Sequence, residues 1–407
     1  MSKAVPEGWA IQSLDGKVHI LSGFPFKSSL FTDDSDYMGI IRIRDLEKQS
    51  IETFYAGDFE ETYVISRGDI LIGMDGDFNI VKWNTKNALL NQRVCKVRAE
   101  TDSGFDTDFL FQSLKEDLHS INASTGATTV KHLSVKDIRG IEKAYPPLPE
   151  QQKIATILSS VDDVIEKTRT QIDKLKDLKT GMMQELLTKG IGHTEFKDSP
   201  VGRIPTAWDV VELGDIAKLE RGRFSHRPRN DPHFYGGNIP FLQTGDIPKE
   251  APQITYFSQT LNEKGLKVSK LFPKGTLVIT IAATIGEIGV LEFDSCFPDS
   301  LVGIKVNQKK VKPMFILYLM RHLKSELESL APQTAQKNIN LDILQLFQIP
   351  LPSIEEQELI ANSMGSVDVR LNILLEKIER IKSIKKALMQ DLLTGKVRVK
   401  PNESAAI

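Results

Sequence analysis

The sequence predicts a mixed α/β (α+β) fold in which one unit, a globular segment followed by a long helix, occurs twice. The first observation is an internal repeat, because residues 146–188 and 352–394 align over 43 positions without a gap. The second is that short apolar and β-branched runs, separated by Gly, Pro and Asn or Asp, fill the segments before both stretches. Because a repeat fixes the architecture, we expect a pseudo-twofold protein.

Both repeated stretches show the pattern of a long amphipathic helix. Glu150 and Glu356 form one of many pairs of identical residues that lie 206 residues apart in the sequence. Ser353 with Glu356 predicts a capping box, and Gly190 and Gly395 predict C-terminal caps. About 38 residues at about 1.5 Å each give a rod of roughly 57 Å.

Apolar residues in both stretches recur at alternating steps of four and three, which is the heptad pattern of a coiled coil. A narrow apolar seam favours a helix as the partner, so we expect the two helices to form an antiparallel coiled coil. The alternative is that each helix packs on its own globular segment. The predicted seam consists of Ile154, Leu158, Val161, Ile165, Ile172, Leu175, Ile360, Val367, Leu371, Leu374, Ile378 and Ile381.

The globular segments repeat more faintly than the helices. "VPEGW" (5–9) matches "IPTAW" (204–208), "RGDILI" (67–72) matches "KGTLVI" (274–279), and Gly23 corresponds to Gly222. One frame with two divergent interiors predicts two related but different surfaces. The expected strands are 38–43, 70–73, 88–97, 239–243, 276–281 and 302–306, and the expected helices lie near 107–119 and 313–329.

Composition excludes several classes of protein. The chain has 407 residues, a net charge of −2 and no run of about 18 apolar residues, so we expect no membrane span and a cytoplasmic location. Residues 1–145 carry 17 Lys and Arg against 22 Asp and Glu, which counts against DNA binding by that segment. Residues 191–349 carry 19 against 17.

No motif for catalysis or for a metal ion stands out. There is no complete Walker A motif, no His-Glu-x-x-His and no Cys-x-x-Cys. "DPHF" (231–234) and "NIPF" (238–241) resemble the motif of amino-methyltransferases, but each lacks one of its paired prolines. We therefore expect no catalytic residue, no metal ligand and no cofactor in this chain.

Several loops have side chains suited to nucleic acid. The segment "ERGRFSHRPRNDPHFYGG" (220–237) is rich in Arg, whose forked donors suit phosphates and guanine edges. The loops 124–132 and 333–340 carry Thr, Gln, Asn and Lys, which contact phosphates and base edges or form ordinary turns. A solvated loop is an equal alternative for the Arg-rich segment. The candidate DNA-binding residues are Arg221, Arg223, Arg227, Arg229, Lys27, Lys131, His132, Gln336, Lys337 and Asn338.

These features together resemble the specificity subunit of a type I restriction–modification enzyme. The resemblance is carried by "PPLPEQQKIATILSSVDDVIE" (146–166), "IPLPSIEEQELIANSMGSVD" (349–368), the helix ends "KTGMMQELLTKGI" (179–191) and "KKALMQDLLTGKVRV" (385–399), and "FKDSPVGRIPTAWDVVELGDI" (196–216). The order of variable segment, helix, variable segment, helix is similar as well, so the resemblance covers nearly the whole chain.

The resemblance implies a division of the chain and a set of partners. It implies target recognition domains at 1–145 and 191–349, spacer helices at 146–190 and 350–398, and a tail at 399–407. Each domain would read one half of an asymmetric two-part site in double-stranded DNA, and the helices would set the spacer. Two modification subunits with adenine methyltransferase activity would dock on the chain, and restriction subunits would complete the complex.

The resemblance also implies that S-adenosylmethionine, ATP and Mg²⁺ bind to the partner subunits and not to this chain. Three alternatives remain open at this point. They are a scaffold whose coiled coil spaces two protein-binding domains, a specificity subunit of a methylation-only system, and a methyltransferase in its own right.

Overall fold

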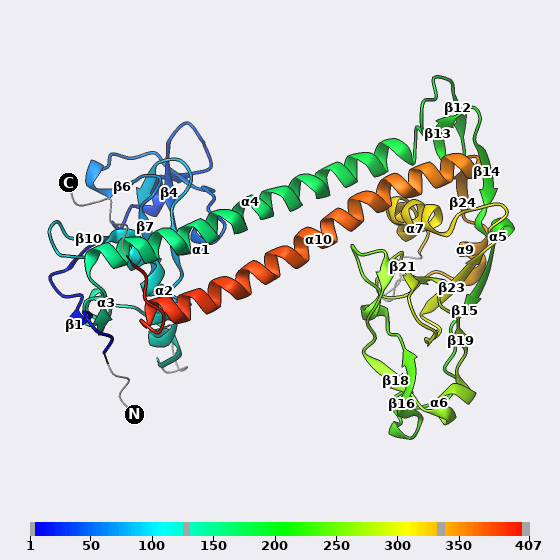
Figure 1. The fold of residues 1–407 in the computed structure, drawn as a ribbon. Coiled ribbons are helices and arrows are strands. Elements are labelled where there is room, and N and C mark those ends of the chain that lie inside the picture. Colours follow the sequence, from blue (N-terminus) through cyan, green and yellow to red (C-terminus); the bar gives the residue numbers. More distant parts are fainter. Residues whose placement is uncertain (1–4, 125–130, 332–337, 401–407) are drawn as a thin grey trace. The chain divides into compact units, whose positions relative to one another are not determined.

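The computed structural model of the chain describes residues 5–124, 131–331 and 338–400. By its contacts the chain divides into unit 1, Met1–Lys167 with Ile378–Ile407, and unit 2, Thr168–Lys377 (Figure 1). Each unit therefore joins one globular part to about half of each long helix, although the sequence alone predicted consecutive segments. The mixed α/β fold with two long helices is confirmed.

The globular part of unit 1 is built on two sheets. An antiparallel sheet has the order β2-β10-β7-β8, and a second, mixed sheet has the order β3-β5-β4-β9-β6. Its strands are β1 (Ala10–Ser13), β2 (Val18–Ser22), β3 (Phe31–Thr32), β4 (Met38–Ile41), β5 (Phe54–Tyr55), β6 (Val64–Ile65), β7 (Ile70–Gly73), β8 (Ile80–Lys82), β9 (Ala88–Leu90), β10 (Val94–Ala99) and β11 (Glu142–Tyr145). Its helices are η1 (Ser28–Leu30), α1 (Ile43–Leu46), η2 (Glu61–Tyr63), α2 (Thr107–Ser124) and α3 (Val135–Arg139).

The globular part of unit 2 repeats this plan. Its first sheet has the order β15-β23-β20-β21-β17 and its second the order β18-β16-β22-β19. Its strands are β12 (Phe196–Ser199), β13 (Gly202–Pro205), β14 (Asp209–Glu212), β15 (Ala217–Arg221), β16 (Tyr235–Phe241), β17 (Gln253–Ile254), β18 (Gln259–Leu261), β19 (Leu271–Phe272), β20 (Leu277–Thr280), β21 (Ile288–Leu291), β22 (Ser295–Cys296), β23 (Leu301–Val306) and β24 (Gln348–Leu351). Its helices are α5 (Leu213–Ile216), η3 (Pro232–Phe234), η4 (Thr244–Asp246), α6 (Glu263–Val268), α7 (Pro313–His322), α8 (Lys324–Ser329) and α9 (Leu341–Gln345).

The two globular parts share strand order as well as sequence motifs. The pair β1–β11 in unit 1 corresponds to β14–β24 in unit 2, and both pairs are antiparallel. The parallel pair β4–β9 corresponds to β16–β22. Short strands of this kind are stable only where one face is buried, and α2 or α7 supplies apolar residues to that core in each unit. The repeat therefore extends to the central strands of both sheets, to which unit 1 adds β3 and unit 2 adds β17 and the pair β12–β13 among the described strands.

A glycine occurs at matching places in the two units, directly after β2 in unit 1 and directly after β15 in unit 2. A Cβ on Gly23 would lie 2.0 Å from the carbonyl oxygen of Asn91. A Cβ on Gly222 would lie 2.3 Å from the carbonyl oxygens of Phe297 and Pro298. Since no side chain fits at such distances, both positions require glycine, which explains why this residue survives in two otherwise divergent segments.

The long helices are α4 (Leu148–Leu186) and α10 (Ile354–Leu393). Within unit 1, the core contains Ile154 and Leu158 of α4 together with Leu392 of α10. Within unit 2, it contains Ile360 and Met364 of α10, with Met183 of α4 packed against it. The two helices are therefore antiparallel within each unit. The N-terminal part of each long helix thus packs on the globular part that precedes it, as the alternative interpretation of the sequence expected.

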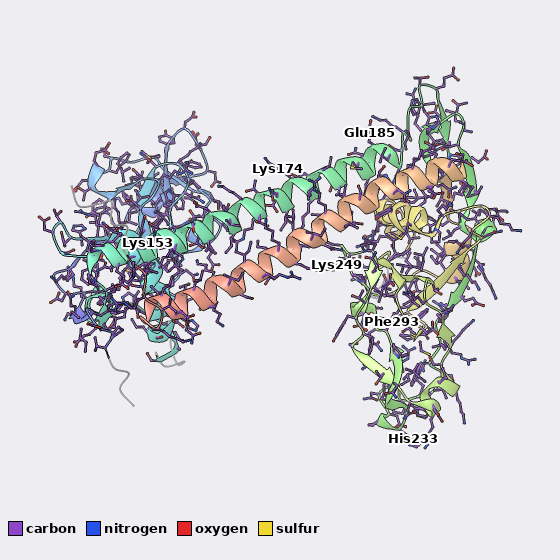
Figure 2. All side chains as sticks on the ribbon, viewed as in Figure 1. Lys153, Lys174, Glu185, His233, Lys249 and Phe293 are labelled. Atoms are coloured by element: carbon purple, nitrogen blue, oxygen red, sulfur yellow. The ribbon has the colours of Figure 1, made fainter. Side chains whose placement is uncertain are left out.

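Most of the predicted seam positions are buried. Those with little exposure are Ile154, Leu158, Ile165, Ile172, Ile360, Val367, Leu371 and Ile378, and those half-buried are Val161, Leu175, Leu374 and Ile381. Charged side chains such as Lys153, Lys174 and Glu185 lie along α4 (Figure 2). Among the described helices, none is both long and apolar enough to cross a membrane.

The predicted ends of the helices agree with the structure in part. Gly190 and Gly395 both have φ of 68°, in the left-handed region that favours glycine at a C-terminal cap. At the start of α10, the backbone N–H of Glu356 donates to Ser353 Oγ at 3.2 Å. The carboxylate of Glu356, however, accepts from Trp208 and not from the backbone of Ser353. The capping box is therefore only half formed, because a buried indole N–H needs that carboxylate.

Candidate nucleic-acid interface

The first turn of each long helix holds a carboxylate that joins three separate segments. Glu150 accepts from Trp9 Nε1 at 3.2 Å and from Arg398 at 2.8 Å. Glu356 accepts from Trp208 Nε1 at 2.9 Å, and its partner in place of arginine is His193 at 2.9 Å. Burial opposes ionisation of Glu150, but the hydrogen bonds from Arg398 and Trp9 outweigh it and lower its pKa.

The glutamine that follows each carboxylate anchors the helix to the loop before α2 or α7. Gln151 accepts from the backbone N–H of Asp106 at 2.9 Å and donates to the carbonyl of Pro146 at 2.9 Å. Gln357 accepts from the backbone N–H of Lys312 at 2.9 Å and donates to the carbonyl of Pro352. Because a buried amide must satisfy its own donors and acceptors, these paired bonds explain why Glu-Gln is kept in both copies.

In unit 1, one polar cluster lies between α4, α10 and α2. Asp162 contacts Lys385 at 2.5 Å and accepts from Gln112 Nε2 at 2.9 Å. Lys115 is 3.9 Å from the same carboxylate. Burial and the neighbouring charge of Lys385 lower the pKa of Lys115 to about 7. We call Asp162, Lys385, Gln112 and Lys115 the unit 1 cluster.

The corresponding cluster in unit 2 lies at the same offset of 206 residues. Asp368 contacts Lys179 at 2.5 Å and accepts from the hydroxyl of Tyr318 at 2.7 Å. Arg321 stands where unit 1 has Lys115, and it donates to backbone carbonyls, including that of Ile288 at 2.9 Å. We call Asp368, Lys179, Tyr318 and Arg321 the unit 2 cluster. In each unit the pair of Asp and Lys joins the two helices at one register.

The arginines of the segment 220–237 are mostly engaged within unit 2. Arg229 forms an ion pair with Asp299 at 2.7 Å. Arg223 donates to a carbonyl at 2.9 Å, and Arg227 to two carbonyls at 2.7 and 2.8 Å. Arg221 ends β15 and is exposed. These bonds give the loop a defined shape, and guanidinium groups with several donors can keep them while facing a ligand.

The tip of this loop is also defined. Asp231 accepts from the backbone N–H of His233 at 3.0 Å and contacts His226 at 3.1 Å. His233 lies at this tip in Figure 2. The residues "DPHF" therefore form the short helix η3, capped by its own aspartate.

The basic candidates in unit 1 differ in their exposure. Lys27 is exposed. Lys131 is half-buried, and its ammonium group donates to the backbone carbonyl of Asn122 at 2.6 Å. His132 is exposed, and its Nδ1 lies 2.7 Å from Asp75. Lys131 thus helps to hold the end of α2, whereas Lys27 and His132 face solvent.

The last three candidates belong to the loop before α9. Gln336 and Lys337 lie outside the described residues. Asn338 is exposed and forms an isolated bridge with Ala282. This bridge joins Asn338 to the segment directly after β20.

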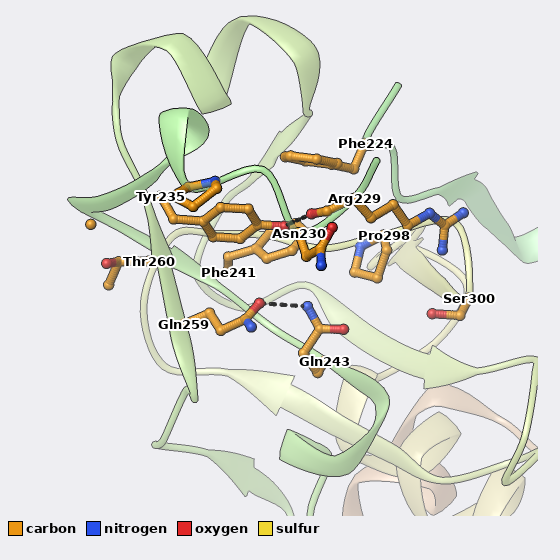
Figure 3. A pocket seen from close by; sticks show the side chains of 12 residues that line it. Phe224, Arg229, Asn230, Tyr235, Phe241, Gln243, Gln259, Thr260, Pro298 and Ser300 are labelled. Carbon is orange, nitrogen blue, oxygen red and sulfur yellow. Dashed lines mark hydrogen bonds between the residues drawn. The ribbon is translucent and has the colours of Figure 1, made fainter. Parts of the chain in front are cut away.

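A hollow of about 530 Å³ in unit 2, which the sequence did not predict, adjoins the arginine segment (Figure 3). Across it, Gln243 Nε2 donates to Gln259 Oε1 at 2.9 Å. The hydroxyl of Tyr235 donates to the carbonyl of Arg229 at its edge. The hollow combines aromatic, amide and arginine side chains, and its lining consists of Phe224, Arg229, Asn230, Pro232, Tyr235, Gly236, Phe241, Gln243, Gln259, Thr260, Pro298 and Ser300.

The described residues contain no cluster of three or more His, Cys, Asp or Glu side chains that could hold a metal ion. Two similar globular parts on paired helices, with unlike side chains on matching loops, define a two-domain recognition protein. Comparison with known proteins shows the family to which the chain belongs.

The family model for the type I restriction modification DNA specificity domain matches residues 6–177 and 205–386. The EcoBI specificity subunit of Escherichia coli is 28% identical, over 93% of this chain and 84% of the relative. The MjaVIII specificity subunit of Methanocaldococcus jannaschii is 28% identical, over 97% and 94%. The fold resembles the S subunit from M. genitalium, with a TM-score of 0.64 and 15% identity over 96% and 97% of the two chains. The chain therefore belongs to the family of type I restriction–modification specificity subunits.

Proposed function

We propose that this chain is the non-catalytic DNA-recognition subunit of a type I complex, and that each globular part reads one half of an asymmetric two-part site. The observation that carries the proposal is that the two units share their framework of strands and helix starts, whereas their exposed loops differ. Both units have the same order of their shared strands, a glycine at the matching positions 23 and 222, and a carboxylate at the start of the long helix. Exposed loops at matching places differ, as two different DNA sequences require.

The helices suit a role in spacing the two half-sites. A straight helix of 39 residues, the length of α4, is about 58 Å long, and one turn of B-DNA is about 34–36 Å. Two recognition domains carried on such helices can address major-groove segments a turn or more apart. Within each unit, the pair of Asp and Lys links the two helices at one register, which supports a role of the helices in setting the spacer.

The same helices are proposed to dock two modification subunits, since their exposed faces carry many charged residues in both copies. Restriction subunits complete the complex. S-adenosylmethionine, ATP and Mg²⁺ then bind to those partners, and the chain works where the DNA is, in the cytoplasm. The acidic balance of residues 1–145 is acceptable if the modification subunits supply much of the phosphate contact.

Within the interface, exposed basic side chains are the proposed phosphate contacts. Arg221, Lys27 and His132 face solvent and have donors to offer. Arg223 and Arg227 hold the loop through backbone carbonyls and present their remaining donors. Alanine at either position should weaken binding to all DNA if it contacts phosphate, and should relax one half-site if it contacts a base.

The test is co-expression with a modification subunit of this family, followed by sequencing of methylated adenines in the host DNA. We expect a two-part methylated motif with a fixed unread spacer. A stable complex that leaves the DNA unmodified would favour a protein-binding scaffold. Binding of S-adenosylmethionine by the isolated chain, measured by calorimetry, would overturn the assignment of catalysis to the partners. Methylation without restriction of unmodified DNA would identify a methylation-only system.

A further inference from the structure

One position lies at the same place in both globular parts and carries a different polar side chain in each. β4 pairs in parallel with β9, and β16 pairs in parallel with β22. Two residues beyond the paired residues Ile40 and Phe241 stand Arg42 and Gln243. Strand pairing therefore makes these two residues equivalent, although no sequence motif marks them.

An aspartate three residues later fixes the backbone at both positions. The N–H of Arg42 donates to Asp45 Oδ2 at 3.0 Å. The N–H of Gln243 donates to Asp246 Oδ2 at 2.7 Å. A one-turn helix follows in each case, α1 in unit 1 and η4 in unit 2. The backbone is thus held alike in both units, and the side chain at the first position is the part that varies.

The two side chains have the donors and acceptors that distinguish bases. Arg42 donates from Nε to Asp45 at 3.2 Å, and its Nη2 is buried without a hydrogen-bond partner among the described residues. The side chain is 23% exposed, so Nη1 is the amino group that can donate to O6 or N7 of guanine. Gln243 uses Nε2 on Gln259, which leaves Gln243 Oε1 and the Gln259 amide group at the hollow. One acceptor and one donor suit N6 and N7 of adenine.

Arg42 also has a structural role that Gln243 lacks. Asp45 is fully buried, and Arg42 partly balances its charge. In unit 2 the same turn is built without a cation, because Asp246 accepts from the backbone of Gln243 and from Ser258 and is only half-buried. The turn therefore forms without arginine where its aspartate is partly exposed, and the charge of the buried Asp45 is what holds Arg42 at it.

We propose that Arg42 and Gln243 are matched specificity-determining residues, one for each half-site. Arg42 selects a guanine in one half, and Gln243 together with Gln259 selects an adenine in the other. The apolar walls of the hollow, Phe241 and Pro298, suit the methyl group of the paired thymine. This inference rests on the proposed function and assigns bases to it.

The experiment uses the complex of the full chain with its modification subunit. Equilibrium binding is measured on duplexes in which each base pair of the wild-type methylated motif is changed in turn. The variants are Arg42→Gln and Gln243→Met, which keep the approximate size of each side chain. The controls are Arg44→Gln, an exposed arginine that lies 3.8 Å from the same Asp45, and Gln308→Met, an exposed glutamine outside the hollow.

We expect Arg42→Gln to remove discrimination at one G·C pair of one half-site, by about tenfold or more. Gln243→Met should do the same at one A·T pair of the other half-site. All other positions should keep their preference, and the controls should match the wild type.

Three results would overturn the inference: unchanged discrimination in both variants, changes that fall in the same half-site, or an equal loss of binding to every duplex. A wild-type motif with no guanine in one half, or no adenine in the other, would also overturn it. Failure of the proposed function looks different, because the wild-type complex would then show no two-part motif at all.

Discussion

Replacing Asp368 by Asn should open the contact between the two helices in unit 2. The side chain of Asp368 is 7% exposed and that of Lys179 is 13% exposed, with 2.5 Å between them. The variant leaves the ammonium group buried without its counter-charge, and breaking a buried pair in this way costs about 3–5 kcal/mol. Because the Asn oxygen can still accept from Tyr318, we expect the lower end, about 3 kcal/mol.

The unit 1 cluster supplies an internal comparison. Asp162 contacts Lys385 at the same 2.5 Å, but its side chain is 35% exposed. Solvent screens such a pair, so Asp162→Asn should cost about 1 kcal/mol. The two substitutions are chemically identical and lie at equivalent positions. A difference between them therefore reflects burial together with the unlike neighbours of the two carboxylates, which are Gln112 and Lys115 in unit 1 and Tyr318 in unit 2.

The assay is a double-mutant cycle with Lys179→Met, read by hydrogen exchange of peptides from 172–186 and 360–375. Hydrogen exchange reports the free energy of local opening, so unit 2 can be followed by itself. Removing both charges should cost less than the sum of the single variants, with a coupling of about 2 kcal/mol. A coupling below about 0.5 kcal/mol, or an equal loss at Asp162, would refute the reasoning.

Three further predictions concern the frame. Gly222→Ala should destabilise unit 2 by about 3 kcal/mol or more in urea unfolding, because its Cβ would meet backbone oxygens, whereas the exposed helical control Gly181→Ala, with no atom near its Cβ, should stabilise by up to about 1 kcal/mol. Arg398→Ala removes a charged partner of the buried Glu150 and should lower the unfolding free energy of unit 1 by about 1–2 kcal/mol. Calorimetry measures this as a lower melting temperature, and an unchanged melting temperature would contradict the prediction. Lys115 has a pKa of about 7 in the folded chain against 10.5 unperturbed, so folding releases a proton at pH values between these two pKa values. The unfolding free energy of unit 1 should therefore rise from pH 7 to pH 10, and Lys115→Met should flatten that rise.

The parts of the fold that follow local rules could be predicted from the sequence. The heptad pattern and the glycine caps located α4 and α10, and the run Ile70–Gly73 became β7 with the same bounds. These elements depend on residues a few positions apart. The packing of the helix starts into the globular cores was the less favoured alternative, because a narrow seam alone does not show which surface covers it.

The candidate site depends on contacts that are distant in sequence. Asp299, the partner of Arg229, lies 70 residues further along the chain, so the arginine segment could not be separated from a solvated loop. The match of Arg42 with Gln243 was also hidden. The repeat has an offset of 206 residues in the helices but 201 at this pair, because loops of unequal length intervene. The strand pairing shows that Arg42 and Gln243 correspond, which an alignment without gaps at an offset of 206 residues misses.

The contact of Arg398 with Glu150 has a consequence for how the chain is made. Glu150 and Trp9 leave the ribosome early, whereas Arg398 and the core residue Leu392 follow more than 200 residues later. At about 5–20 residues per second, the first globular part waits for roughly ten seconds or more before its last pieces are synthesised. The nascent chain must therefore protect an unfinished apolar surface during translation, and a truncated product would lack the residues that finish its first domain.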